Sequence, residues 1–74
     1  PNTNTGRIHY EKVDIPKKGD VVWFPGHVGF YDPNGEADGK PVYSATRSGG
    51  VRHESYKAFG GNPVFYRMKI LESN

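Results

Sequence analysis

The chain has 74 residues, which limits it to one domain with a small hydrophobic core. Hydrophobic residues make up 34% of the sequence and aromatic residues 14%, so large rings must supply much of the buried area. The formal net charge is +2 and the charges are scattered, which argues against a nucleic-acid-binding domain, while the lack of cysteine excludes disulfides and a thiol nucleophile within this chain.

We expect residues 1–15 to be a polar N-terminal segment or linker stump with a possible short strand, and residues 16–74 to form a β-sheet subdomain. Residues 1–6 (PNTNTG) are turn formers without periodicity, and we expect no regular structure there. Residues 7–13 alternate weakly between apolar and polar side chains, which predicts a short extended segment. His9, within that segment, receives no predicted role.

The clearest feature is a pair of strands joined by a tight turn. Residues 21–24 (VVWF) form a short apolar run between turns, which is typical of a strand buried on both faces. Pro25 and Gly26 suit a tight turn, and residues 27–31 (HVGFY) predict the returning strand. Because side chains alternate across a strand, one face should carry His27, Gly29 and Tyr31.

Three further strands are predicted in the rest of the chain. Residues 32–41 are dense in turn formers and predict a hairpin loop. Residues 42–46, 51–56 and 64–70 predict strands that are separated by glycine-rich turns. No segment shows a helical period, so we expect a small antiparallel β sheet or half-open barrel of about five strands.

The first hairpin carries a family resemblance. Residues 18–31 (KGDVVWFPGHVGFY) resemble the signature of NlpC-type papain-like cell-wall cysteine peptidases: Gly-Asp, an apolar run, then His-Val-Gly, an apolar residue and Tyr. Residues 42–45 and 49–52 resemble the third strand and the following turn of that family, and residues 64–67 its closing strand. The resemblance spans about residues 16–69 and implies the β half, C-terminal and histidine-bearing, of an α+β papain-like fold whose nucleophile helix is missing.

The resemblance also implies a function. NlpC-type domains are amidases or endopeptidases that cleave stem-peptide amide bonds of peptidoglycan by Cys–His acyl transfer, so an upstream segment or another chain would supply the cysteine. The setting would be secretion or delivery to the bacterial periplasm or cell wall. The long loop at residues 32–41 fits a toxin effector, for which an immunity or inhibitor protein is a further expected partner. We expect no metal, cofactor or nucleic-acid partner, and no membrane span.

Four polar residues are the candidates for the site. His27 matches the catalytic histidine of the family, and a histidine after a tight turn and beside Gly29 leaves room for a substrate or helix to approach. Ser44 stands where the family has an orienting His, Asn or Gln; its hydroxyl can accept the imidazole N–H but is short and uncharged. His53 is an alternative orienting residue if its face converges on His27, although a solvated histidine is favoured. Asp20 is expected to cap its turn.

The candidate substrate-binding residues are Trp23, Gly29 and Tyr31. A second hypothesis is a non-catalytic binding module, whose exposed aromatic residues and mild positive charge engage an anionic cell-wall polymer or a protein partner. It explains the missing cysteine without a second segment. A serine hydrolase that uses Ser44 with His27 is less favoured, because no oxyanion donor is indicated. In either case a sheet without its covering helix should present an apolar patch and associate or be poorly soluble when alone.

Overall fold

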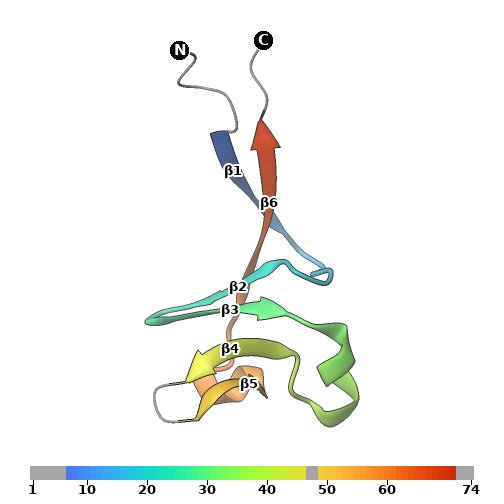
Figure 1. Cartoon of the computed structure of the whole chain (residues 1–74), viewed down its shortest axis with the longest axis vertical. Coiled ribbons are helices and arrows are strands. Elements are labelled where there is room, and N and C mark those ends of the chain that lie inside the picture. The colour runs from blue at the N-terminus through green and yellow to red at the C-terminus, as the bar shows by residue number, and fades with distance from the viewer. Residues whose placement is uncertain (1–6, 47–48, 72–74) are drawn as a thin grey trace.

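The computed structural model describes residues 7–46 and 49–71, and the expectation for residues 1–6 lies outside this part. Within it, six antiparallel strands form one open sheet in the order β1-β6-β2-β3-β4-β5 (Figure 1). The strands are β1 (Arg7–Val13), β2 (Val21–Phe24), β3 (His27–Tyr31), β4 (Val42–Thr46), β5 (Gly50–Glu54) and β6 (Val64–Leu71). Two 3-10 helices complete it, η1 (Pro33–Asp38) and η2 (Tyr56–Phe59). The predicted small antiparallel sheet is confirmed.

The predicted strand boundaries hold best where turns are tight. β2 and β3 pair as a hairpin, with Phe24 opposite His27 across the Pro25–Gly26 turn. Gly26 has a φ of 84°, the left-handed conformation that this turn needs at its second position. The weak segment at residues 7–13 is a full strand, because it pairs along its whole length with β6.

The strand predicted at residues 51–56 is wrong at its C-terminal end. β5 stops at Glu54, and Tyr56 instead begins η2. The cause is local: the Ser55 hydroxyl accepts a hydrogen bond from the backbone N–H of Ala58 at 3.3 Å and so caps a helical turn. The predicted loop at residues 32–41 likewise contains η1, which Asp32 caps through the N–H of Asn34.

A two-stranded arm extends from the rest of the sheet. The first residues of β6, 64–66, lie between β1 and β2, whereas residues 67–71 pair with residues 7–11 of β1 alone among the described strands. The arm runs up the long axis of the molecule in Figure 1, which measures 45 Å against 27 Å and 22 Å for the other two axes. Glu11 and Lys69 form an ion pair at 3.0 Å across it.

One face of the sheet, the covered face, holds the hydrophobic core. The core consists of Val22, Phe24, Tyr31 and Val42, whose side chains are between 0% and 7% exposed. Phe59 and Tyr56 of η2, together with Phe65 of β6, pack against it. The segment that follows β5 thus returns over the sheet and buries the covered face.

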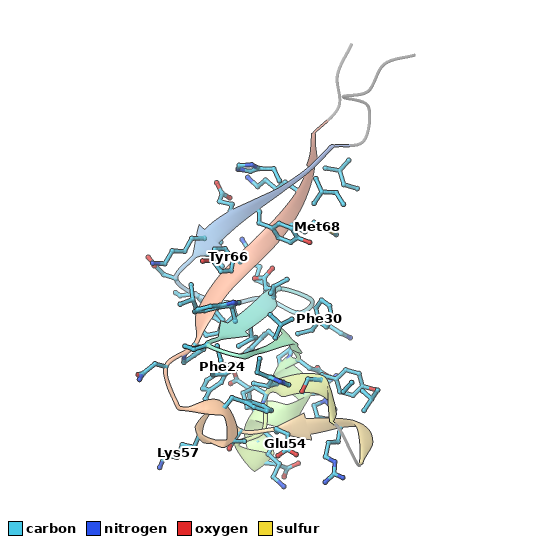
Figure 2. The ribbon with its side chains drawn as sticks, turned by 90° about the vertical axis from the view of Figure 1, so that its left-hand side faces the viewer. Phe24, Phe30, Glu54, Lys57, Tyr66 and Met68 are labelled. Atoms are coloured by element: carbon cyan, nitrogen blue, oxygen red, sulfur yellow. The ribbon has the colours of Figure 1, made fainter. Side chains whose placement is uncertain are left out.

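The opposite face, the open face, is apolar but exposed. Trp23 is 41% exposed and Phe30 52%, and the register puts both on the side of the sheet away from Phe24. Phe24 and Phe30, one from each face, are labelled in Figure 2. The apolar surface continues along the arm through Tyr10 and Met68. The expectation that β2 is buried on both faces is therefore wrong within this chain, and the expected apolar patch is present.

Candidate functional site

His27 and Ser44 meet on the covered face. His27 begins β3 and Ser44 lies in the middle of β4, and the two strands are neighbours in the sheet. The Nε2 atom of His27 lies 3.1 Å from the hydroxyl oxygen of Ser44, within hydrogen-bond distance. Ser44 is only 5% exposed and His27 is half-buried, so this contact is partly shielded from water. The structure thus brings together the two residues that the sequence analysis placed in one site.

An aromatic ring from a distant part of the chain fixes the imidazole. The rings of Phe59 and His27 stack with their centroids 3.8 Å apart and their planes 8° from parallel. Phe24 supports Phe59 from the core at a centroid distance of 5.3 Å. Phe59 is thus a positioning residue that the sequence analysis did not identify. Its place depends on η2, for which the sequence showed no helical period.

The direction of the hydrogen bond between His27 and Ser44 decides which ring nitrogen can act as a base. A neutral imidazole has one N–H and one lone pair. When Nε2 of His27 donates its proton to the Ser44 hydroxyl, the lone pair is on Nδ1. Nδ1 is then the atom that can take a proton from another group.

The space beside Gly29 is filled by the sheet itself. Gly29 is buried, and a Cβ at that position would lie 2.6 Å from Cγ1 of Val42 and 3.0 Å from Cβ of Ser44. The missing side chain therefore lets β4 pack closely rather than leaving room for a substrate or helix. Tyr31 is 7% exposed and packs edge-on against Phe65. Both residues contribute to packing, and their contact with a substrate stays a prediction.

Trp23 lies on the other face from His27 but at the same end of the sheet. It lines a cleft of about 370 Å³ whose wall also contains Phe59, the ring that stacks on His27. Of the three predicted substrate-binding residues, Trp23 is therefore the one with both an exposed surface and a place near the imidazole.

His53 takes a different partner. Its Nε2 atom lies 2.9 Å from Oδ2 of Asp32, and by register it stands opposite Tyr43 on the open face. The hydrogen bond from His53 is the main cause that lowers the pKa of Asp32, and the backbone N–H of Asn34 adds to it. His53 thus does not converge on His27, and Ser44 is the residue in contact with that imidazole.

Asp20 caps its turn as expected, since its Oδ2 atom accepts the backbone N–H of Lys17 at 2.7 Å. It also accepts two hydrogen bonds from Arg67, at 3.0 Å from Nε and 2.7 Å from Nη2. Arg67 is the main cause that lowers the pKa of Asp20, with the Lys17 N–H acting in the same direction and burial opposing both. This pair ties the start of β2 to β6, 47 residues away.

The described residues, 7–46 and 49–71, contain no group of three or more His, Asp or Glu side chains arranged to hold a metal ion. No helix in this part of the chain is long and apolar enough to cross a membrane. No protein-family model, curated protein or solved structure matches the chain. The NlpC resemblance therefore stays a prediction that is carried by the sequence motifs.

Proposed function

We propose that this chain is the histidine-bearing sheet of a peptidoglycan hydrolase that cleaves stem-peptide amide bonds by Cys–His acyl transfer. The observation that carries the proposal is the contact between Nε2 of His27 and the Ser44 hydroxyl at 3.1 Å, inside a sequence run that resembles the NlpC signature. A base that is oriented by a third polar group is the arrangement that activates a nucleophile. The cysteine comes from an upstream segment or a second chain.

The reaction has two steps, acylation of the thiol and hydrolysis of the thioester. Nδ1 of His27 takes the thiol proton while the sulfur attacks the amide carbonyl carbon, and a C–S bond forms. The C–N bond then breaks, and the amine leaves with the proton that His27 returns. Water hydrolyses the resulting thioester, which releases a carboxylate and restores the thiol.

Ser44 and Phe59 hold the imidazole in this scheme. In this scheme the Ser44 hydroxyl accepts the Nε2 proton of His27, which leaves the lone pair on Nδ1. Because a hydroxyl carries no charge, it stabilises the imidazolium less than a carboxylate would. The stacked Phe59 ring supplies the remaining constraint on the orientation of the ring.

The proposed setting is the bacterial cell wall or periplasm, where peptidoglycan is the substrate. A toxin effector is the role that the long η1 loop favours, and an immunity or inhibitor protein would then be a partner. Basic residues number ten against eight acidic ones and form no cluster suited to nucleic acid, so the charge pattern does not favour a nucleic-acid target instead.

The test is to combine the chain with its cysteine-bearing segment, fused or added as a second chain, and to measure amines released from purified peptidoglycan. His27→Ala is expected to lower release by about 10²–10⁴-fold, the contribution of a general base. His53→Ala is the matched control, because it removes a histidine that is bonded to Asp32 on the open face. Equal release from wild type and His27→Ala would reject the proposal.

The open face favours a second candidate, a non-catalytic module that binds an anionic cell-wall polymer. Phe30 and Tyr43 lie beside Lys18 in a shallow groove on this side of the sheet. The groove also contains Asp32, whose Oδ2 atom is paired with His53, so Lys18 is the charge that would contact an anionic polymer. Cosedimentation with cell walls before and after removal of their anionic polymer tests it. Binding that requires the polymer and is weakened by Phe30→Ala would support the module, whereas binding unaffected by either change would reject it.

A further inference from the structure

The sheet has two edge strands, β1 and β5, and β1 is the longer. β1 has seven residues and pairs with β6 along its whole length, whereas β5 has five. No other strand within residues 7–46 and 49–71 lies on the outer side of β1. The backbone N–H and C=O groups along such an edge can pair with a strand from another chain.

The arm formed by β1 and β6 would gain most from an added strand. Residues 67–71 pair with β1 alone among the described strands, and the arm stands clear of the rest of the sheet (Figure 1). Its open face carries Ile8, Tyr10, Met68 and Ile70, whose side chains are 52% to 63% exposed. Two strands alone form only a marginally stable ribbon in water. A strand at the edge of β1 would therefore stabilise the arm through backbone hydrogen bonds and apolar contacts.

The sequence of β1 suits pairing with a second copy of itself. In an antiparallel pair of identical strands, the two-fold axis passes through one residue, which lies opposite its own copy. When all seven residues pair, this central residue is Tyr10, and each His9 lies opposite a Glu11. Each Ile8 lies opposite a Lys12, whose aliphatic stem can cover it. Among residues 8–12, this register sets no two like charges opposite each other.

The ion pair within the arm is compatible with this register. Oε1 of Glu11 lies 3.0 Å from Nζ of Lys69 in the same chain. A carboxylate has several acceptor sites, so Glu11 can also accept a hydrogen bond from the His9 ring of the second copy. Each Glu11 would then be held from both neighbouring strands.

The other edge strand does not suit pairing with itself. Antiparallel pairing along all of β5 is centred on Arg52 and sets two guanidinium groups opposite each other. Like charges in that position destabilise a strand pair. Because one edge is self-complementary and the other is not, pairing through β1 closes as a dimer rather than continuing into a fibre.

We propose that two copies of this chain pair antiparallel through β1, centred on Tyr10, and join their six-stranded sheets into one. This interface goes beyond the proposed function and does not depend on it, because it uses neither His27 nor Ser44. It is also separate from association through the open face around Phe30, which lies in β3, three strands in from β1.

Single cysteines test the pairing, because the chain has none of its own. In the dimer the Cα atoms of Tyr10 and its copy are about 4.5–5.5 Å apart, which a disulfide can span. Tyr10→Cys in oxidised glutathione should therefore shift to twice the monomer mass, and dithiothreitol should reverse the shift. Met68→Cys is the matched control, because Met68 lies opposite Tyr10 on the same face and is 52% exposed against 53%. It should not cross-link, since its copy is three strand spacings away, roughly 14 Å.

A mixture of two variants tests the register with Tyr10 in place. Ile8→Cys and Lys12→Cys should not cross-link separately, because each residue lies roughly 14 Å from its own copy along the strand. Mixed together, they should cross-link to each other. Phe30→Lys, which acts on the open face, should leave the cross-link of Tyr10→Cys unchanged. No cross-link from Tyr10→Cys and none from the mixture would overturn the inference, as would equal cross-linking of Met68→Cys.

Discussion

The two faces of this sheet are built from the same strands but differ in how far they are buried. In β2, Val22 and Phe24 are fully buried on the covered face, while Trp23, between them in sequence, is 41% exposed on the open face. Both faces are apolar, so hydrophobicity does not separate them. What separates them is η2, which returns over the covered face and adds Phe59 and Tyr56 to its core. Alternation decides which residues share a face, and the return of the chain decides which face is buried.

Two of the charged pairs follow the same division. Asp20, only 5% exposed, joins Arg67 beside the covered core through two hydrogen bonds. Asp32 and His53 pair on the open side, where their side chains are 19% and 38% exposed. An ion pair that water can reach is screened and contributes little, whereas a shielded acceptor left without its donors is costly. The faces should therefore respond differently to equivalent substitutions.

The largest expected effect comes from truncating one phenylalanine on each face. Phe24→Ala should lower the free energy of unfolding by about 3–5 kcal/mol, because it empties the best-buried aromatic site. Phe30→Ala should cost less than about 1 kcal/mol, since half of that side chain is already in water. Urea denaturation followed by Trp23 fluorescence measures both variants. Equal losses in the free energy of unfolding would contradict the difference in burial between the two faces.

Neutralising one aspartate on each face should give a smaller difference. Asp20→Asn should lower the free energy of unfolding by about 1.5–3 kcal/mol, the contribution of hydrogen bonds to a charged group. Asp32→Asn should change the free energy of unfolding little. Because the folded state lowers the pKa of Asp20, its contribution is fully present above the ordinary carboxyl value of 3.8 and is lost as the pH falls through the lowered value. The difference in the free energy of unfolding between wild type and Asp20→Asn should therefore shrink in acid. Urea denaturation at several pH values measures it, and a difference that is constant with pH would contradict this.

The smallest expected effect on stability, with a clear effect on association, is a charge on the open face. The exposed apolar surface should make the chain associate as its concentration rises. Phe30→Lys should reduce that association in sedimentation velocity experiments, while Ile15→Lys should not, because Ile15 is 79% exposed but lies before β2, outside the open face. A wild-type chain that is monomeric at every concentration would contradict the prediction that the open face causes association.

Much of the sheet could be predicted because its signals are local. Turn residues and alternation place β2, β3 and β4, and they put His27, Gly29 and Tyr31 on one face. The contact between His27 and Ser44 follows from the resemblance, which aligns both residues with positions of one site.

The rest of the site could not be predicted because it depends on contacts that are distant in sequence. Phe59 reaches His27 only because Ser55 caps η2, and a single 3-10 turn has no periodicity to detect. Arg67 pairs with Asp20 only because β6 crosses beside β2, and no spacing between the two residues indicates this. The filled space beside Gly29 depends on the register between β3 and β4, which the turn formers of a ten-residue loop do not specify.

The proposed mechanism requires that His27, on the covered face, is a base with its lone pair on Nδ1. Two-bond ¹H–¹⁵N NMR of the imidazole, at a pH where the ring is neutral, reports which nitrogen carries the proton. We expect His27 to be the tautomer protonated at Nε2, and Ser44→Ala to make the population of the two tautomers more even while the signals of His53 stay unchanged. A His27 ring protonated at Nδ1 in the wild-type chain would contradict it.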